Sequence, residues 1–471
     1  MTMLSRAIAL AVGSFGIAAT AQAATYVVTA KSQSFDTQLA RKIEAAGGTI
    51  TARLPQIGVA VVESNQSTFA TRAAKVQGIR SVVSDYVMQF DVPQAQASFE
   101  EDYSNPPNSG DNDTRFDLQW GSAAIDVAGA WNQGYRGNGA VVAVLDSGVV
   151  CQHVDIAPNL LADSASFVPG EGVCHTTAGN FNHGTHVAGI IAAPDNAIGT
   201  IGVAPQAKIL AVKVLSGVSG SGSFSGIIQG IVYAADHGAD VINMSLGVRG
   251  GLPVNGPGAN DVRELINATK RAVQYARDQN AITIVAAGND ARDLDHDSGV
   301  EICDQGDCYR ANLRAFPAQL PNTLAISATT PVGWAINPAG NLDYLASYSS
   351  YGQSAIAFAG PGGDTPLFGT APGMANCTVA GITRPCYVFD LVFAPGGYLP
   401  AGSLYFWSAG TSMATPHVSG VAALIVGKHG GELAPAEVER LLRASSDDLG
   451  KPGNDDVYGG GRVNASRAVQ D

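Results

Sequence analysis

Charged residues are scarce in this chain, and basic residues are scarcer than acidic ones. Asp, Glu, Lys and Arg make up 14% of its 471 residues, against roughly 25% in an average soluble protein. The 27 basic side chains are outnumbered by 40 acidic ones, so the formal net charge is −13. Because nucleic-acid binding needs a basic surface, we expect no nucleic-acid partner. The hydrophobic share of 46% excludes a chain that is disordered as a whole.

Long apolar runs are also missing beyond the N-terminus. A membrane-spanning helix needs roughly 18 or more apolar residues in a row, and the run at residues 7–20 is too short. This run follows Arg6 and ends at Ala21-Gln22-Ala23, a small-x-small pattern typical of signal-peptide cleavage. We therefore predict a secretory signal peptide at residues 1–23. The mature protein should have no membrane span and be secreted, either to the extracellular space or to a periplasm.

No two cysteines have the CxxC spacing that marks many zinc sites. The six cysteines instead fall into three couples that are close in sequence, and short loops are the easiest to close. In an exported protein we favour disulfides over a metal site. Six cysteines allow about 15 pairings, of which we favour Cys151 with Cys174, Cys303 with Cys308, and Cys377 with Cys386.

The N-terminal part of the mature chain differs from the rest in charge. Residues 24–90 carry seven Lys or Arg and four Asp or Glu, a charge of +3, whereas residues 91–471 carry −17. Apolar patterns in 24–90 predict strands at 26–30, 48–54, 58–63 and 79–87 and helices at 37–46 and 68–76. This β-α-β-β-α-β order is typical of a small ferredoxin-like α+β domain. Residues 91–114 lack Lys and Arg, contain three prolines and read as an acidic linker or processing region.

Residues 115–471 alternate short apolar runs with helical patterns. Buried strands are predicted at 141–145, 209–214, 241–244, 282–287, 323–327 and 356–359, and helices at 183–192, 224–237, 261–278, 413–426 and 435–444. Such alternation is typical of an α/β fold, a parallel sheet with helices on both faces. We expect a single domain over these residues.

Three polar residues stand where strands end or helices begin, which is where open α/β sheets bind ligands. Asp146 follows the run at 141–145, His183 begins a predicted helix, and Ser412 precedes the apolar helix near the C-terminus. Each also has a structural interpretation, since Asp favours turns and Ser caps helices. His183 and His186 could bind zinc, but there is no HExxH motif and no evident third ligand.

The order Asp, His, Ser is that of subtilisin, whereas α/β-hydrolases run Ser, Asp, His. The segments DSGV, NHGTHVAGII and GTSMATPHVSG resemble the three signature blocks of the subtilisin-like serine proteases. The resemblance implies a secreted serine endopeptidase that uses Asp146, His183 and Ser412 through an acyl-enzyme. His186 and His417 then have structural roles. A lipase or esterase is disfavoured because no full GxSxG motif occurs, and a catalytically dead peptide-binding protein because every catalytic position is filled.

The same resemblance implies the rest of the site. The oxyanion hole is formed by Asn289 and the Ser412 N–H. The substrate lies between two backbone edges, at Gly220, Ser221 and Gly222 and at Ser245, Leu246 and Gly247, and Phe224 and Ile227 line an apolar pocket for its fourth residue before the scissile bond.

The resemblance further implies a self-processing zymogen. Residues 24–90 are the inhibitory pro-domain, and its removal within 91–114 leaves a monomer that acts on proteins and peptides. Structural Ca²⁺ is expected at the side chains of Asp155 and Asn196 and the carbonyls of Pro194, Ile198 and Thr200, since oxygen ligands suit calcium. No redox or organic cofactor is expected.

Overall fold

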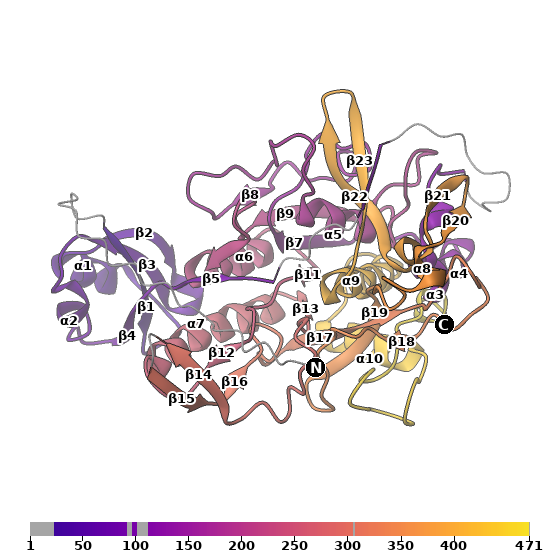
Figure 1. Cartoon of the computed structure of the whole chain (residues 1–471). Coiled ribbons are helices and arrows are strands. Elements are labelled where there is room, and N and C mark those ends of the chain that lie inside the picture. Colours follow the sequence, from indigo (N-terminus) through magenta and orange to yellow (C-terminus); the bar gives the residue numbers. More distant parts are fainter. Residues whose placement is uncertain (1–22, 92–96, 101–111, 305–306, 471) are drawn as a thin grey trace.

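The computed structural model describes residues 23–91, 97–100, 112–304 and 307–470. The predicted signal peptide therefore lies outside the described residues except for Ala23. Figure 1 shows a small N-terminal unit on the left, packed against a larger unit built on a central sheet. The junction between the two units contains helices α6 (Phe224–Asp236) and α7 (Ala259–Asp278).

The small unit has the predicted β-α-β-β-α-β order. It comprises β1 (Ala24–Ala30), α1 (Thr37–Ala45), β2 (Thr49–Leu54), β3 (Val59–Ser64), α2 (Phe69–Ala73) and β4 (Ile79–Ser84), and its antiparallel sheet has the order β2-β3-β1-β4. The Asp36 side chain caps α1 by accepting the Leu39 N–H. Helix α2 is shorter than the predicted 68–76. The apolar faces of both helices pack on the sheet around Ile43, Val62 and Phe69.

The central sheet has the order β18-β17-β13-β11-β7-β9-β8, with β19 also paired to β17. Its strands are β7 (Val141–Asp146), β8 (Ala165–Ser166), β9 (Lys208–Lys213), β11 (Val241–Met244), β13 (Ile282–Ala286), β17 (Thr323–Thr330), β18 (Tyr344–Leu345) and β19 (Ile356–Pro361). All of these pairs are parallel except that between β17 and β18. A strand is thus present at each of the ranges that we predicted from apolar runs.

Helices cover both faces of this sheet, as the sequence predicts. The remaining long helices are α5 (His183–Ala192), α9 (Thr411–Lys428) and α10 (Pro435–Ser445), and the short ones are α3 (Trp120–Ala124), α4 (Val127–Asn132), α8 (Ala371–Met374) and α11 (Ala465–Ala468). Along β7, Val142 and Val144 belong to the apolar core that contains α5 and α9, whereas Ala143 and Leu145 belong to the core that contains α6 and α7. Burial on both faces explains why such strands are apolar throughout.

A strand lies within residues 91–114, which we predicted to be an acidic linker or processing region. Strand β6 (Ala97–Glu100) pairs antiparallel with β23 (Gly402–Ser408), and β23 pairs on its other side with β22 (Val392–Leu399). In Figure 1 the β22–β23 hairpin projects from the top of the large unit. At the other end of the linker, Asp113 is fully buried against the large unit.

Short two-stranded sheets and disulfides complete the large unit. The small sheets are β10 (Ser221–Ser223) with β5 (Val87–Gln89), β12 (Leu252–Pro253) with β16 (Leu313–Arg314), β14 (Val300–Asp304) with β15 (Asp307–Ala311), and β20 (Asn376–Val379) with β21 (Ile382–Pro385). Short 3₁₀ turns lie at Pro55–Ile57, Phe116–Leu118 and Cys386–Asp390. The disulfides join Cys151 to Cys174, Cys303 to Cys308, and Cys377 to Cys386, which is the pairing that we favoured.

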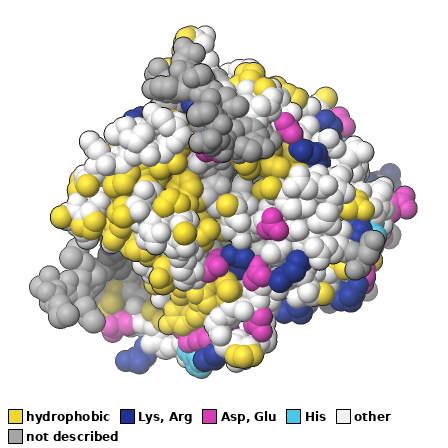
Figure 2. Space-filling view, turned by 90° about the vertical axis from the view of Figure 1, so that its right-hand side faces the viewer, with side chains coloured by type: hydrophobic (Ala, Val, Ile, Leu, Met, Phe, Trp, Pro, Cys, Tyr) yellow, Lys and Arg dark blue, Asp and Glu magenta, His cyan; other side chains and the backbone are white. Residues whose placement is uncertain are grey.

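The surface reflects the low content of charged residues. On the face in Figure 2, apolar side chains gather in patches while acidic and basic side chains lie singly or in small groups. The exposed large apolar side chains include Ile336 and Phe368. No helix among the described residues has the length and apolar character needed to cross a membrane.

Candidate active site

His183 and Asp146 form a buried pair between α5 and β7. Asp146 ends β7, and His183 begins α5, whose N-terminus Asn182 caps by accepting the Thr185 N–H. The His183 Nδ1 atom lies 2.9 Å from each carboxylate oxygen of Asp146, and both side chains are buried. The Ser147 N–H donates to the same carboxylate at 2.6 Å. The buried charge of Asp146 therefore has the partners that offset its loss of hydration.

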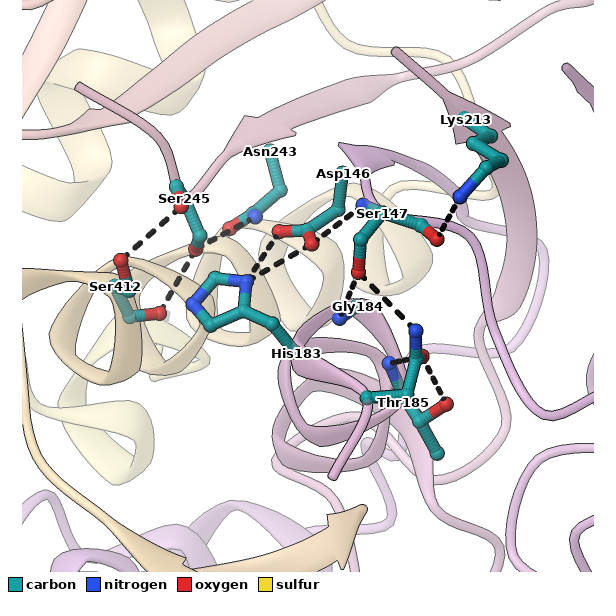
Figure 3. Close-up of polar contacts among 10 residues, drawn as sticks. Asp146, Ser147, His183, Gly184, Thr185, Lys213, Asn243, Ser245 and Ser412 are labelled. Atoms are coloured by element: carbon teal, nitrogen blue, oxygen red, sulfur yellow. Dashed lines mark hydrogen bonds and ion pairs between the residues drawn. The ribbon is translucent and has the colours of Figure 1, made fainter. Parts of the chain in front are cut away.

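Ser412 lies on the side of the His183 ring away from Asp146 (Figure 3). It is the second residue of α9, where the backbone N–H groups have no acceptor within the helix. Its hydroxyl donates to the Ser245 carbonyl at 3.1 Å, and the Ser245 hydroxyl donates back to the Ser412 carbonyl at 2.8 Å. Within the described part of the chain, His183 Nε2 has no hydrogen-bond partner. This nitrogen is therefore free to accept a proton.

The Asn289 amide is held in one orientation beside Ser412. Its Oδ1 atom accepts the Thr411 N–H at 2.9 Å and the Thr411 hydroxyl at 2.8 Å. Its Nδ2 group donates to the Asp91 carboxylate at 2.9 Å. Because Thr411 precedes Ser412, these bonds fix a side-chain N–H donor next to the serine. They direct this donor toward residues 87–91, the segment at the end of the small unit that we call the tail.

Two backbone edges of the large unit hold that tail in an extended conformation. Strand β10 pairs antiparallel with β5, so that Gly222 lies opposite Met88. The Phe90 N–H donates to the Gly220 carbonyl at 3.3 Å, and the Asp91 N–H donates to the Gly247 carbonyl at 2.9 Å. The edges that the sequence predicted for substrate are thus the edges that bind residues 87–91.

Apolar side chains of the tail enter the core between these edges. Phe224 and Ile227, in the first turns of α6, are buried in one cluster with Met88 and Phe90. The predicted apolar pocket residues therefore belong to the same apolar cluster as Met88 and Phe90. Leu246 belongs to the same cluster.

A pocket beside Gly247 contains two charged residues that sequence reasoning did not place. It is lined by Gly288, Asp290, Arg292 and Phe316, among others. Burial raises the pKa of the Asp290 carboxyl. Arg292 forms an ion pair with Asp297 and donates a hydrogen bond to the Gly250 carbonyl. Only the position of Asp290, directly after Asn289 in the sequence, could have identified it.

Two buried histidines, His186 and His417, lie on the same helices as His183 and Ser412, and each bonds to a backbone carbonyl. His186 Nε2 is 3.0 Å from the Phe406 carbonyl, and His417 Nδ1 is 2.8 Å from the Met413 carbonyl. Burial lowers the pKa of His186 to about 3 and those of His417 and His153 to about 4. No group of three or more His, Cys, Asp or Glu side chains suited to a metal occurs among the residues described. The zinc interpretation of His183 and His186 therefore gains no support.

The predicted calcium ligands lie around one loop, at residues 194–200. Asp155 is fully buried and accepts the Thr200 N–H at 2.9 Å and the Tyr405 hydroxyl at 2.9 Å. Asn196 Oδ1 accepts the Ile198 N–H at 3.0 Å. The loop also binds Asp113, which we had assigned to the linker: this fully buried carboxylate accepts the Ala197 N–H at 2.7 Å. An acidic residue just before the large unit was the only signal for it.

Comparison with known proteins identifies the family of this chain. Residues 137–461 match the sequence pattern of the Subtilase family. M-protease of Shouchella clausii is 35% identical over 356 residues, which are 75% of this chain and 70% of that protein. Subtilisin Savinase of Lederbergia lenta is 34% identical over 356 residues, which are 75% of this chain and 99% of that protein. The chain therefore belongs to the subtilase family and is a subtilisin-like serine endopeptidase.

Solved structures show the same fold. The epidermin leader peptide processing serine protease of Staphylococcus aureus has a TM-score of 0.72 at 22% identity, over 95% of this chain and 98% of that one. Fervidolysin of Fervidobacterium pennivorans, a keratinolytic enzyme related to subtilisin, has a TM-score of 0.67 at 25% identity. The match covers 95% of this chain and 61% of fervidolysin. At 22% identity, the likeness to the Staphylococcus aureus protease shows a shared fold and nothing more.

Proposed function

We propose that this endopeptidase is a secreted, self-processing zymogen whose catalytic triad is Asp146, His183 and Ser412. The single observation that carries the proposal is the His183 ring, with Nδ1 2.9 Å from both Asp146 oxygens and Nε2 on the side of Ser412. An aspartate in that position holds the imidazole in the tautomer that has a free Nε2, and it stabilises the imidazolium that forms later.

The reaction follows from these positions. The Ser412 hydroxyl turns from the Ser245 carbonyl to His183 Nε2, gives its proton to that nitrogen, and its oxygen attacks the peptide carbonyl carbon. The carbonyl oxygen becomes an oxyanion, which Asn289 Nδ2 and the Ser412 N–H stabilise by donating hydrogen bonds. His183 then gives the proton to the leaving nitrogen as the C–N bond breaks. Water repeats the sequence on the acyl-enzyme and releases the acid.

Residues 24–90 act as a ferredoxin-like inhibitory pro-domain in this proposal. Its support is the tail at 87–91, which pairs with β10 and ends with Asp91 bound to Asn289. A peptide that adds a strand to the groove competes directly with substrate. Cleavage after this segment, within 91–114, would release the groove.

Charge complementarity is expected to assist docking of the pro-domain. The pro-domain carries +3 against −17 for the rest, and Arg80 forms a bidentate pair with Glu264 at 2.7 and 3.0 Å. Opposite charges across an interface mainly raise the rate of association and are screened by salt.

Calcium is proposed as a structural ion at residues 194–200. The donor set suits it, because Asp155, Asn196 and the carbonyls of Pro194, Ile198 and Thr200 supply only oxygen. Asp113 adds a second fully buried carboxylate to the same loop. Bound calcium would balance buried negative charge and fix this loop, and it takes no part in the chemistry.

The proposal is tested by expressing the wild-type chain and the Ser412→Ala variant in a protease-deficient host. We expect the wild type to be secreted, to shorten itself within 91–114 and to hydrolyse casein. The Ser412→Ala chain should lose only its signal peptide and should not hydrolyse casein. Full processing of the variant would contradict self-cleavage, and casein hydrolysis by the purified variant would contradict the role of Ser412.

A further inference from the structure

Strand β6 is the next described segment after the inhibitory tail, and it pairs with the strand that precedes the catalytic serine in the chain. The tail reaches Asp91 at the edge formed by Gly247, and the chain is again described at Ala97, where β6 starts. There it pairs with β23, whose end leads through Ala409 and Gly410 into α9 and Ser412. Two separate strand additions, on β10 and on β23, therefore hold two segments of one chain on the large unit.

The direction of pairing is the one that a bound substrate requires. Ala97 lies opposite Trp407, the paired residue nearest to Ser412 in sequence, and Glu100 lies opposite Leu404, which is further from it. On the other side, Gln89 lies opposite Ser221 and Val87 opposite Ser223. The tail thus runs along β10 to the edge at Gly247, and residues 97–100 run along β23 in the direction that leads away from Ser412 in sequence.

The β22–β23 hairpin is attached by side-chain contacts to the helix that begins with His183. His186 in α5 lies 3.0 Å from the Phe406 carbonyl, and the Phe181 and Phe406 rings pack edge to face with centroids 5.3 Å apart. Tyr405 and Trp407 are fully buried in a separate aromatic cluster. An edge held on both flanks can bind a strand without first becoming ordered.

We propose that the outer edge of β23, residues 404–407, is a docking site for the part of a polypeptide substrate that follows the scissile bond. In the sheet formed by the described residues, β6 is the outer strand, so its departure would leave the β23 backbone as an unpaired edge. Such edges bind extended chains through main-chain hydrogen bonds. This inference rests on the proposed proteolytic function and on release of residues 97–100 from β23.

The occupant is an extended polypeptide with a long segment after the scissile bond. In this chain the paired residues follow Asp91 by six to nine positions, so a substrate must extend that far to gain the contact. Backbone pairing requires no particular side chain. The site should therefore favour long, unfolded chains over short peptides, with little dependence on sequence.

The test compares three quenched fluorescent peptides on the mature wild-type enzyme. One copies residues 86–102, the second ends at residue 96, and the third is the long peptide with methyl groups on the four backbone nitrogens of positions 97–100. Since each net hydrogen bond contributes a modest amount, we expect kcat/KM for the first to exceed the other two about tenfold, mostly through KM. The methylated peptide is the matched control, because it has the same length and side chains.

Equal kcat/KM for the three peptides would overturn the docking edge and leave the proteolytic function intact. The three values of kcat/KM would also be equal if residues 97–100 stayed on β23 after processing. The inference would then be wrong as well, because it requires their release. Loss of the advantage on shortening but not on methylation would also overturn it, because the gain would then not come from backbone pairing. Failure to cleave casein or any of the peptides would instead overturn the proposed function, and this inference with it.

Discussion

The side chain of Phe90 permits a quantitative test of the proposal that residues 87–91 inhibit the enzyme. Phe90 is 1% exposed and belongs to the apolar cluster that spans both units and contains Phe224 and Ile227, and not to the separate core of the small unit around Ile43 and Phe69. A Cβ atom on Gly222 would lie 3.3 Å from its ring, which shows how closely the groove surrounds it. Truncation by Phe90→Ala should therefore weaken binding without unfolding the pro-domain.

The size of the effect follows from this burial. Removing a fully buried phenylalanine side chain costs about 3–5 kcal/mol in protein cores. At a domain interface we take the lower figure, about 3 kcal/mol, which corresponds to a rise of about 150-fold in the inhibition constant. Val87 is the first residue of β5, three positions before Phe90, and it is 71% exposed, so Val87→Ala should change the constant by no more than about twofold.

The assay adds a separate polypeptide of residues 24–91, in wild-type, Phe90→Ala and Val87→Ala form, to the mature enzyme and measures inhibition of peptide hydrolysis. Circular dichroism of each polypeptide checks that the pro-domain remains folded. If Phe90→Ala and Val87→Ala inhibit equally well, the tail does not bind as the structure has it, and the account of inhibition is wrong.

Four further predictions concern the oxyanion hole, docking, stability and calcium. Asn289→Ala should lower kcat about 10²–10³-fold with little change in KM, the cost that subtilisin itself shows for this donor; an unchanged kcat would remove Asn289 from the mechanism. Arg80→Ala should weaken inhibition by residues 24–91 several-fold at low salt and hardly at high salt, because its pair with Glu264 is partly exposed; equal loss at both would contradict electrostatic docking. Burial raises the pKa of Asp240 from 3.8 to about 6, so the folded state disfavours the ionised carboxylate. Asp240→Asn in the Ser412→Ala chain should therefore raise the urea midpoint of unfolding at pH 8 and leave it unchanged near pH 4. A midpoint that rises near pH 4 and not at pH 8 would refute this. A calcium chelator should lower the Tm of the mature enzyme, and Asp113→Asn should lower it as Asp155→Asn does; an unchanged Tm in the presence of the chelator would contradict the calcium site.

The sequence predicted those features that depend on local patterns. Strand β11 and helix α5 have the predicted bounds, because apolar runs and a capping asparagine specify them within a few residues. The positions of Asp146, His183 and Ser412 follow from the same local signals, since each stands at the end of a strand or the start of a helix. Residues at such positions converge once the parallel sheet forms.

Features that depend on distant pairing were not predictable in this way. Nothing in residues 97–100 marks them as a strand, because their pairing depends on the edge of β23, about 300 residues away. Asp113 is one of several acidic residues in the segment 91–114, and nothing in the sequence distinguishes it from the others. Its burial depends on the N–H groups of residues 196 and 197. The charged pocket with Asp290 and Arg292 is assembled by loops whose course has no sequence period.

The central claim, that Ser412 is the nucleophile activated by His183, is tested most directly by covalent labelling. The mature enzyme is treated with a fluorophosphonate and digested, and the labelled peptide is sequenced by mass spectrometry. We predict one label, on Ser412, together with complete loss of activity; the label should be absent from Ser412→Ala and formed far more slowly in His183→Ala. A label on another residue, or labelling of Ser412 at the same rate without His183, would contradict the account.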